Sequence, residues 1–180
     1  ISLFNDTYYL ITIVRMLQCS DCKKALTDAA TGLYNRNYWE RIVKSPDYDY
    51  KTKNFSLIFI DVDNLKEIND TYGHIIGDKV IETVGQAIKN CIRKEDSGLR
   101  YGGDEFIVLL FNRDKKLAYK VVKRIRSEIN RLATDLGIEI QISAGAAYYD
   151  TFRNMAEIIS IADRNLYEEK RIKHMKAKRR

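Results

Sequence analysis

Apolar and polar positions change their spacing several times along the chain, and each change marks an expected element. Residues 54–62 and 105–111 are short runs of mostly apolar residues, which is the pattern of buried strands. A hairpin is expected to pair 98–101 with 105–111, because the two glycines between them can adopt positive φ at little steric cost. A further strand is expected over 138–149.

Apolar residues at helical spacing predict helices before, between and after these strands. The expected ranges are about 35–45, 64–71, 75–92, 114–134 and 154–175. Strands that alternate with amphipathic helices indicate an α/β domain, with helices over a central sheet.

Residues 1–27 are expected to form a helical linker or stalk at the end of an upstream region. Their apolar residues fall on one helical stripe, formed by Leu10, Ile13, Val14, Leu17 and Ala25. The chain opens on Ile rather than Met, which favours a longer protein. A terminal helix that packs on its own domain is the alternative. The domain itself is expected over 28–175, followed by a basic tail at 176–180.

The net charge of +6 is concentrated near the C-terminus. Residues 168–180 carry seven Lys and Arg and two Glu, a net charge of +5, which leaves +1 for the rest of the chain. A globular part that is nearly neutral argues against a nucleic-acid-binding face. The tail is interpreted as a solvated helix end, with membrane or nucleic-acid contact as the weaker alternative.

The three cysteines indicate a reducing compartment, because their number is odd and no secretory signal is recognised in this sequence. We therefore expect a cytoplasmic domain. Cys19 and Cys22 have C-x-x-C spacing, but no second pair accompanies them, so they are interpreted as inert. A redox pair, or a metal site completed by a second chain, is the alternative. The apolar segment Tyr8–Val14 is too short to span a membrane.

Acidic residues end one expected strand and open another. Asp61 and Asp63 lie two residues apart at the end of the first strand, so they share a face. Asp104 and Glu105 follow the paired glycines directly, and adjacent like charges repel. If the two ends meet, their carboxylates form a site for Mg²⁺, which prefers oxygen ligands and shares them with substrate phosphates. An ordinary acidic hairpin tip is the alternative for Gly-Gly-Asp-Glu alone.

Five motifs, in order along the chain, give it a resemblance to a known family. They are Asp28-Ala-Ala-Thr-Gly-Leu-Tyr-Asn-Arg36, Asp61-Val-Asp-Asn-Leu-Lys66, Asn69-Asp70 with Gly73-His74-Ile-Ile-Gly77-Asp78, Gly102-Gly-Asp-Glu-Phe106, and Ala162-Asp163 with Leu166-Tyr167 and Lys170. Over roughly residues 28–170 the chain resembles the GGDEF domain of diguanylate cyclases. Ala30 departs from the family, which usually has Leu there.

The resemblance implies a fold, an activity and partners. The fold is α/β with a central, mainly antiparallel sheet flanked by helices, similar to nucleotidyl cyclases and polymerase palms. The activity is that of a nucleotidyltransferase, which condenses two GTP into the bacterial second messenger cyclic di-GMP and releases two pyrophosphates. It needs two domains that face each other around a two-fold axis, and therefore a homodimer. An upstream sensor region in the same chain is implied as a partner, in a larger sensor or membrane-associated protein.

Site residues follow from the same resemblance. The implied metal ligands are Asp61, the backbone carbonyl of Val62, and Asp104, which hold a pair of Mg²⁺ ions, with Mn²⁺ as a substitute. Asp104 and Glu105 are the implied catalytic acids. Asp63 is expected to have a structural role instead, such as capping the following helix.

Asn69 and Asp78 are the residues that the resemblance assigns to the base. A carboxylate can accept hydrogen bonds from N1–H and N2–H₂ of guanine, and an amide can donate to O6. Adenine lacks N1–H and would leave Asp78 unpaired, which favours GTP.

Lys66 and Lys170 are implied to contact the triphosphate as point charges. Family members often carry Gly-Arg-Asn soon after the second lysine, whereas this chain has Lys173 and His174. Arg171 or Lys173 is the expected substitute for that arginine.

Arg93 and Asp96 form an R-x-x-D sequence at the family's spacing before Gly102. The resemblance makes them an inhibitory site for the product, because an arginine fork can bind guanine O6 and N7 together. A solvated helix end is the alternative.

Three other functions compete with a cyclase. The first is a catalytically silent module that binds GTP or cyclic di-GMP. The second is a domain that only dimerises through residues 1–27. The third is another nucleotidyl cyclase or palm-like polymerase, which also has paired acids at strand ends.

Overall fold

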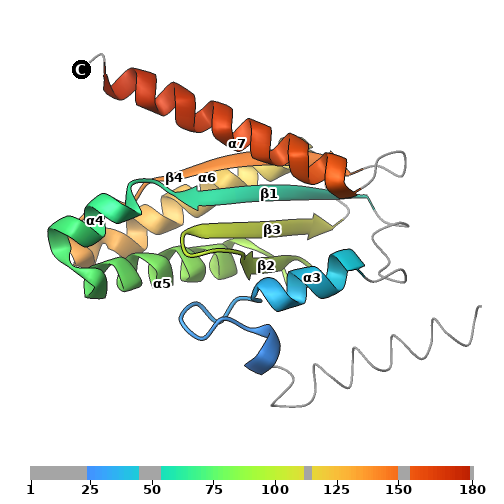
Figure 1. Ribbon diagram of the computed structural model, residues 1–180, viewed down its shortest axis with the longest axis horizontal. Helices are drawn as coiled ribbons and strands as arrows, with labels where there is room; N and C mark the ends of the chain where they lie inside the picture. The colour runs from blue at the N-terminus through green and yellow to red at the C-terminus, as the bar shows by residue number, and fades with distance from the viewer. Residues whose placement is uncertain (1–23, 45–53, 112–114, 150–154, 179–180) are drawn as a thin grey trace, which may run out of the picture.

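A four-stranded antiparallel sheet forms the centre of the computed structural model, which describes residues 24–44, 54–111, 115–149 and 155–178. The strands are β1 (Phe55–Val62), β2 (Ser97–Arg100), β3 (Glu105–Phe111) and β4 (Ile142–Tyr149). Their order is β2-β3-β1-β4, so β4 is an edge strand and β1 is central (Figure 1). The expected antiparallel α/β fold and the β2–β3 hairpin are confirmed.

Helices cover both faces of this sheet. They are α3 (Arg36–Lys44), α4 (Leu65–Tyr72), α5 (His74–Cys91), α6 (Lys115–Leu132), the short 3₁₀ helix η2 (Ala133–Leu136) and α7 (Met155–Ala177). The α5 and α6 helices pack on one face, and α3 and α7 pack on the other. Every helix expected from the sequence within the described residues is present, with bounds that differ by one or two residues.

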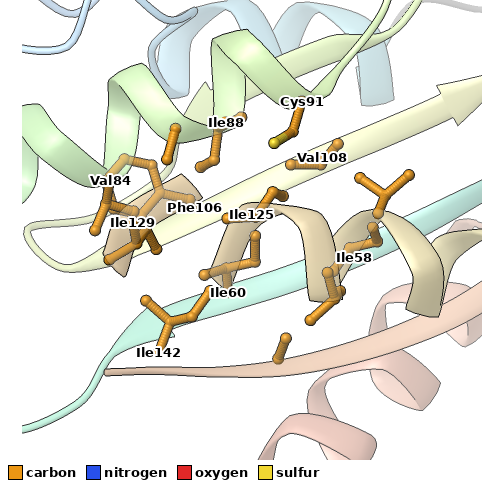
Figure 2. Packing of buried hydrophobic residues seen from close by; sticks show 14 of the residues in the cluster. Ile58, Ile60, Val84, Ile88, Cys91, Phe106, Val108, Ile125, Ile129 and Ile142 are labelled. Carbon is orange, nitrogen blue, oxygen red and sulfur yellow. The ribbon is translucent and has the colours of Figure 1, made fainter. Parts of the chain in front are cut away.

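The central strand shows why the sequence lacks polar alternation. All eight residues of β1 are buried, because both faces of the sheet are covered. Ile58 and Ile60 join the α5–α6 cluster, whereas Leu57 and Phe59 join the α3–α7 cluster. Figure 2 shows the first cluster, in which side chains of α5 and α6 meet those of β1, β3 and β4. Each such side chain stabilises the fold by about 1.5–3 kcal/mol.

The last strand is shorter than the sequence pattern indicates. The prediction of a strand from residue 138 was wrong, because β4 begins at Ile142. Ile142 pairs with Val62, the last residue of β1, so residues 138–141 have no partner strand. Their apolar pattern instead reflects burial, since Ile140 is only 3% exposed.

Gly145 holds α7 unusually close to β4. A Cβ atom at this position would lie 2.1 Å from the carbonyl oxygen of Ala162 and 2.2 Å from the amide nitrogen of Leu166. The backbone of α7 therefore rests directly on the sheet, and the helix runs along β1 toward the strand end that carries Asp61 (Figure 1).

Several expectations lie outside the described residues. They concern the helical stripe within residues 1–23, and Cys19 and Cys22. Among the helices that the structure does describe, none combines the length and apolar character needed to cross a membrane.

Candidate active site

The two acidic ends predicted from the sequence meet at one end of the sheet. Asp61 of β1 is the cross-strand partner of Glu105 of β3. The amide of Val62 donates to the carbonyl oxygen of Asp104 over 3.0 Å, which ties the end of β1 to the hairpin. Asp61, Asp104 and Glu105 therefore belong to one local cluster, which we call the acidic cluster.

The two glycines of the hairpin do not have the backbone conformation that the sequence led us to expect. Neither Gly102 nor Gly103 has a positive φ, so the conformational argument was wrong. A Cβ atom at Gly102 would lie 2.5 Å from Oε2 of Glu105, because that carboxylate folds back over the turn. A Cβ atom at Gly103 would have no neighbour within 4 Å. The first glycine thus makes room for Glu105, and the second leaves the backbone open to a ligand.

Burial and mutual repulsion act on the acidic cluster. Burial, with the nearby charges of Asp104 and Asp63, raises the pKa of Asp61, although Lys170 opposes the shift. Burial also raises the pKa of Glu105, together with the charges of Asp104 and Asp61. The ionised cluster is therefore costly, and an added cation would relieve that cost.

A lysine of α7 supplies one such cation. Nζ of Lys170 lies 2.7 Å from Oδ2 of Asp61, whose side chain is 11% exposed. In the described part of the chain, no group of three or more His, Cys, Asp or Glu residues is arranged to hold a metal ion. The oxygen donors of Asp61, Asp104 and the Val62 carbonyl fit Mg²⁺ in kind, and Mg²⁺ usually binds with one or two carboxylates plus substrate phosphates. The site therefore suits an ion that arrives with a phosphate ligand.

Asn69 and Asp78 lie at the junction of two helices beside this site. Gly73, with φ 84°, connects α4 directly to α5. A Cβ atom at Gly77 would lie 1.7 Å from the amide oxygen of Asn69, so the Asn69 side chain rests on the backbone of α5 next to Asp78. Asp78 is exposed, and so is Lys66 on the first turn of α4. The two residues assigned to the base are thus brought together.

Arg100 was missed by the sequence analysis. Its guanidinium donates to the carbonyl oxygen of Gly103 over 2.8 Å and to Oδ2 of Asp28 over 3.3 Å. Asp28 also accepts from the amide and the hydroxyl of Thr31, over 2.8 and 2.7 Å. Burial raises the pKa of Asp28, but the hydrogen bonds from Thr31 and the Arg100 charge outweigh it, so the pKa is lowered overall. Arg100 therefore joins the N-terminal motif to the hairpin, and its place two residues before Gly102 was the available signal.

Asp63 has the structural role expected of it, but not as a cap of the next helix. The N-cap residue of α4 is Asn64, which makes no side-chain capping bond. Asp63 instead accepts from the hydroxyl of Ser143 over 2.6 Å and from Nζ of Lys173 over 2.7 Å.

Lys173 was one expected substitute for the missing arginine. The other expected substitute, Arg171, is paired with Glu168 over 2.9 Å. Both candidate phosphate contacts are therefore engaged with acids.

Arg93 and Asp96 lie in the turn from α5 to β2, at the end of β2 opposite the hairpin. The Asp96 carboxylate accepts from the amides of Arg93 and Phe111, over 3.0 and 3.2 Å. Asp96 thus closes the turn and fastens it to the end of β3, whereas Arg93 is exposed.

Comparison with known proteins places this arrangement in a family. Residues 25–176 match the family described as "Diguanylate cyclase, GGDEF domain". Diguanylate cyclase A of Treponema denticola is 37% identical over 80% of this chain and 41% of its own length. Diguanylate cyclase DosC of Escherichia coli is 34% identical over 93% of this chain and 38% of its own length. This chain thus spans about two fifths of these relatives.

A solved structure shares the fold. The GGDEF domain of DgcB from Caulobacter crescentus, in complex with c-di-GMP, superposes with a TM-score of 0.73 at 26% identity. The match covers 82% of this chain and 91% of that domain.

Proposed function

This chain belongs to the GGDEF family of diguanylate cyclases, and from that premise we propose that it condenses two GTP into cyclic di-GMP with release of two pyrophosphates. The observation that carries the proposal is the pairing of Asp61 with Glu105 beside the Gly102–Phe106 hairpin. A cluster of partly buried acids that a cation would relieve suits phosphoryl transfer, which depends on positioning and charge neutralisation.

In this reaction the 3′-hydroxyl of one GTP attacks the α-phosphate of the other. Asp61, Asp104 and the Val62 carbonyl would hold Mg²⁺, which when bound neutralises the phosphate charge and activates the hydroxyl. Glu105 orients the attacking hydroxyl or its metal, and the open backbone at Gly103 lets the nucleotide lie against the turn.

Lys170 exchanges partners during binding. Its ammonium is paired with Asp61, which is a proposed metal ligand. Asp61 would then hold the metal and Lys170 would contact the triphosphate, so the Lys170–Asp61 pair would open when metal and nucleotide bind together. Lys66 supplies a second positive charge from α4.

Asn69 and Asp78 select guanine. The Asn69 side chain is fixed against Gly77, and the exposed Asp78 is the next residue of α5. Asp78 accepts from N1–H and N2–H₂ of guanine, and Asn69 donates to O6. ATP is rejected because it would leave the carboxylate unpaired.

Two such domains act together, because one domain holds one GTP. We place the catalytic domain at 28–175 and assign residues 1–27 to a linker that brings two copies together in a cytoplasmic part of a larger sensor. The relatives named above are also longer than this chain, which supports this organisation.

Arg93 and Asp96 are proposed to bind the product and inhibit the enzyme. The exposed guanidinium of Arg93 is available for guanine O6 and N7. Each Asp96 oxygen accepts one backbone hydrogen bond and keeps a second lone pair for the base edge.

The test is incubation of the purified chain with GTP and Mg²⁺, followed by identification of the products by mass. Wild type should yield cyclic di-GMP, and Asp104→Ala should yield none. A silent binding module remains the rival function, favoured by the engagement of both Arg171 and Lys173 with acids. It predicts that GTP binds to wild type and no product forms.

A further inference from the structure

Two lysines of α7 pair with two aspartates at the end of β1. Nζ of Lys170 lies 2.7 Å from Asp61, and Nζ of Lys173 lies 2.7 Å from Asp63. The acids are two residues apart on the chain and the lysines are three apart on the helix. Two residues of extended chain span at most about 7 Å and three helical residues rise about 4.5 Å, so the two pairs lie close together.

The Lys173–Asp63 pair has more additional hydrogen bonds than the Lys170–Asp61 pair. Lys173 also donates to the carbonyl oxygen of Ile142 over 2.6 Å, and Asp63 also accepts from Ser143. The Lys173 side chain is 34% exposed, against 42% for Lys170. Lys173 is thus anchored at the start of β4, whereas the Lys170 ammonium pairs with Asp61 alone among the described residues.

Arg126 leaves Lys173 available for Asp63, because it pairs with the other acid near Lys173. Glu169 lies 3.4 Å from Nζ of Lys173, but it also pairs with Arg126 of α6. Arg126 donates to the same Ile142 carbonyl, over 3.2 Å. Asp63 has no such alternative, because Lys173 is its one cationic partner in the described part of the chain.

Removal of the Lys173 charge would change the partner of Lys170. Asp63 would then be a partly buried carboxylate bonded only to a hydroxyl, close to Asp61, whose pKa it already helps to raise. The flexible Lys170 side chain starts one helical turn away and would be the nearest replacement. It would then be shared between two acids, and the bare charge of Asp63 would repel an incoming triphosphate.

We propose that Lys173 is a positioning residue, which neutralises Asp63 and thereby leaves Lys170 free to pass from Asp61 to the triphosphate. The inference rests on the proposed function, in which Lys170 contacts the nucleotide. Lys173 itself does not touch the substrate.

The test measures binding of guanosine 5′-(α,β-methylene)triphosphate with Mg²⁺ by calorimetry, because this analogue cannot release pyrophosphate. Lys173→Met should weaken its binding roughly tenfold, the size of one charge-assisted contact. Adding Asp63→Asn should restore most of the affinity, since Asn can still accept from Ser143 without a negative charge. Lys173→Arg should bind nearly as well as wild type. Lys176→Met, an exposed lysine on the same helix, is the matched control.

A purely structural clamp gives the opposite pattern. In that case the double variant would bind as weakly as Lys173→Met or more weakly, and that result would overturn the proposal. Equal binding by Lys173→Met and Lys176→Met would overturn it as well. If the chain makes no cyclic di-GMP but the double variant restores analogue binding, the proposed reaction fails while the role of Lys173 stands.

Discussion

Asp28 and the acidic cluster both lie near the β2–β3 hairpin, and they are in opposite electrostatic states. On one side, Asp28 accepts hydrogen bonds from Thr31 and Arg100, and its pKa is lowered. On the other side, Asp61 and Glu105 face each other, and their pKa values are raised. Asp28 stabilises the hairpin through Arg100, whereas the electrostatic free energy of the acidic cluster is unfavourable until a cation binds. A carboxylate with several hydrogen-bond donors around it has a structural role, whereas carboxylates that repel one another mark a candidate binding site for a cation.

The largest expected effect comes from removing a charge from the acidic cluster. Glu105→Gln keeps the shape of the side chain, and it should reduce turnover by a factor of 100 or more, about 3 kcal/mol of transition-state stabilisation. The free energy of unfolding should stay the same or rise, because a repelling charge is lost. Turnover assays and urea unfolding test both halves, and a loss of both activity and stability would place Glu105 with Asp28 instead.

The Arg93–Asp96 turn tests whether a carboxylate that accepts two backbone hydrogen bonds can also bind a ligand. Arg93→Ala should weaken product binding roughly 10- to 100-fold, which corresponds to the loss of a two-pronged charged contact of about 1–3 kcal/mol. Initial turnover should be nearly unchanged, because the turn lies at the end of β2 opposite the hairpin.

Asp96→Ala should instead lower the free energy of unfolding, since two backbone amides lose their acceptor. Calorimetric titration with cyclic di-GMP decides the matter. Equal dissociation constants for wild type and Arg93→Ala would make Arg93 a solvated residue.

On the stable side, Arg100→Met should lower the free energy of unfolding by about 1–2 kcal/mol. The substitution removes the bonds to Asp28 and to the Gly103 carbonyl, and leaves a partly buried carboxylate with fewer donors. Arg164→Met, an exposed arginine on α7, is the control. Urea unfolding of the two variants should differ, and matching midpoints would show that the Asp28–Arg100 contact contributes nothing.

Local patterns predicted most of the fold, and the pairing of acids predicted the centre of the site. The sequence placed Asp61 at a strand end and Glu105 at a hairpin, and the resemblance to the GGDEF family indicated that the two lie together. The start of β4 at Ile142 could not be predicted, because it depends on where β1 ends. The reason for Gly102 depends on the rotamer of Glu105, and the partners of Asp63 come from positions 143 and 173, far along the chain. Contacts between distant residues set these features, and no local pattern records them.

The smallest expected effect is on the pH dependence of stability, where the two sides have opposite signs. Because the pKa of Asp28 is lowered on folding, its contribution to stability is present above its unfolded pKa and lost as pH falls through the folded value. Because the pKa of Glu105 is raised, folding is favoured below its unfolded pKa, and this contribution is lost as pH rises through the folded value.

In a metal-free buffer between about pH 3 and 7, Asp28→Asn should therefore remove a rise in stability with pH, and Glu105→Gln should remove a fall. Each change should be a few tenths of a kcal/mol to about 1 kcal/mol, because both carboxylates are partly solvated. Urea unfolding at several pH values gives the slopes for wild type and both variants. If both variants shift the slope of stability against pH in the same direction, Asp28 and Glu105 are not in opposite electrostatic states.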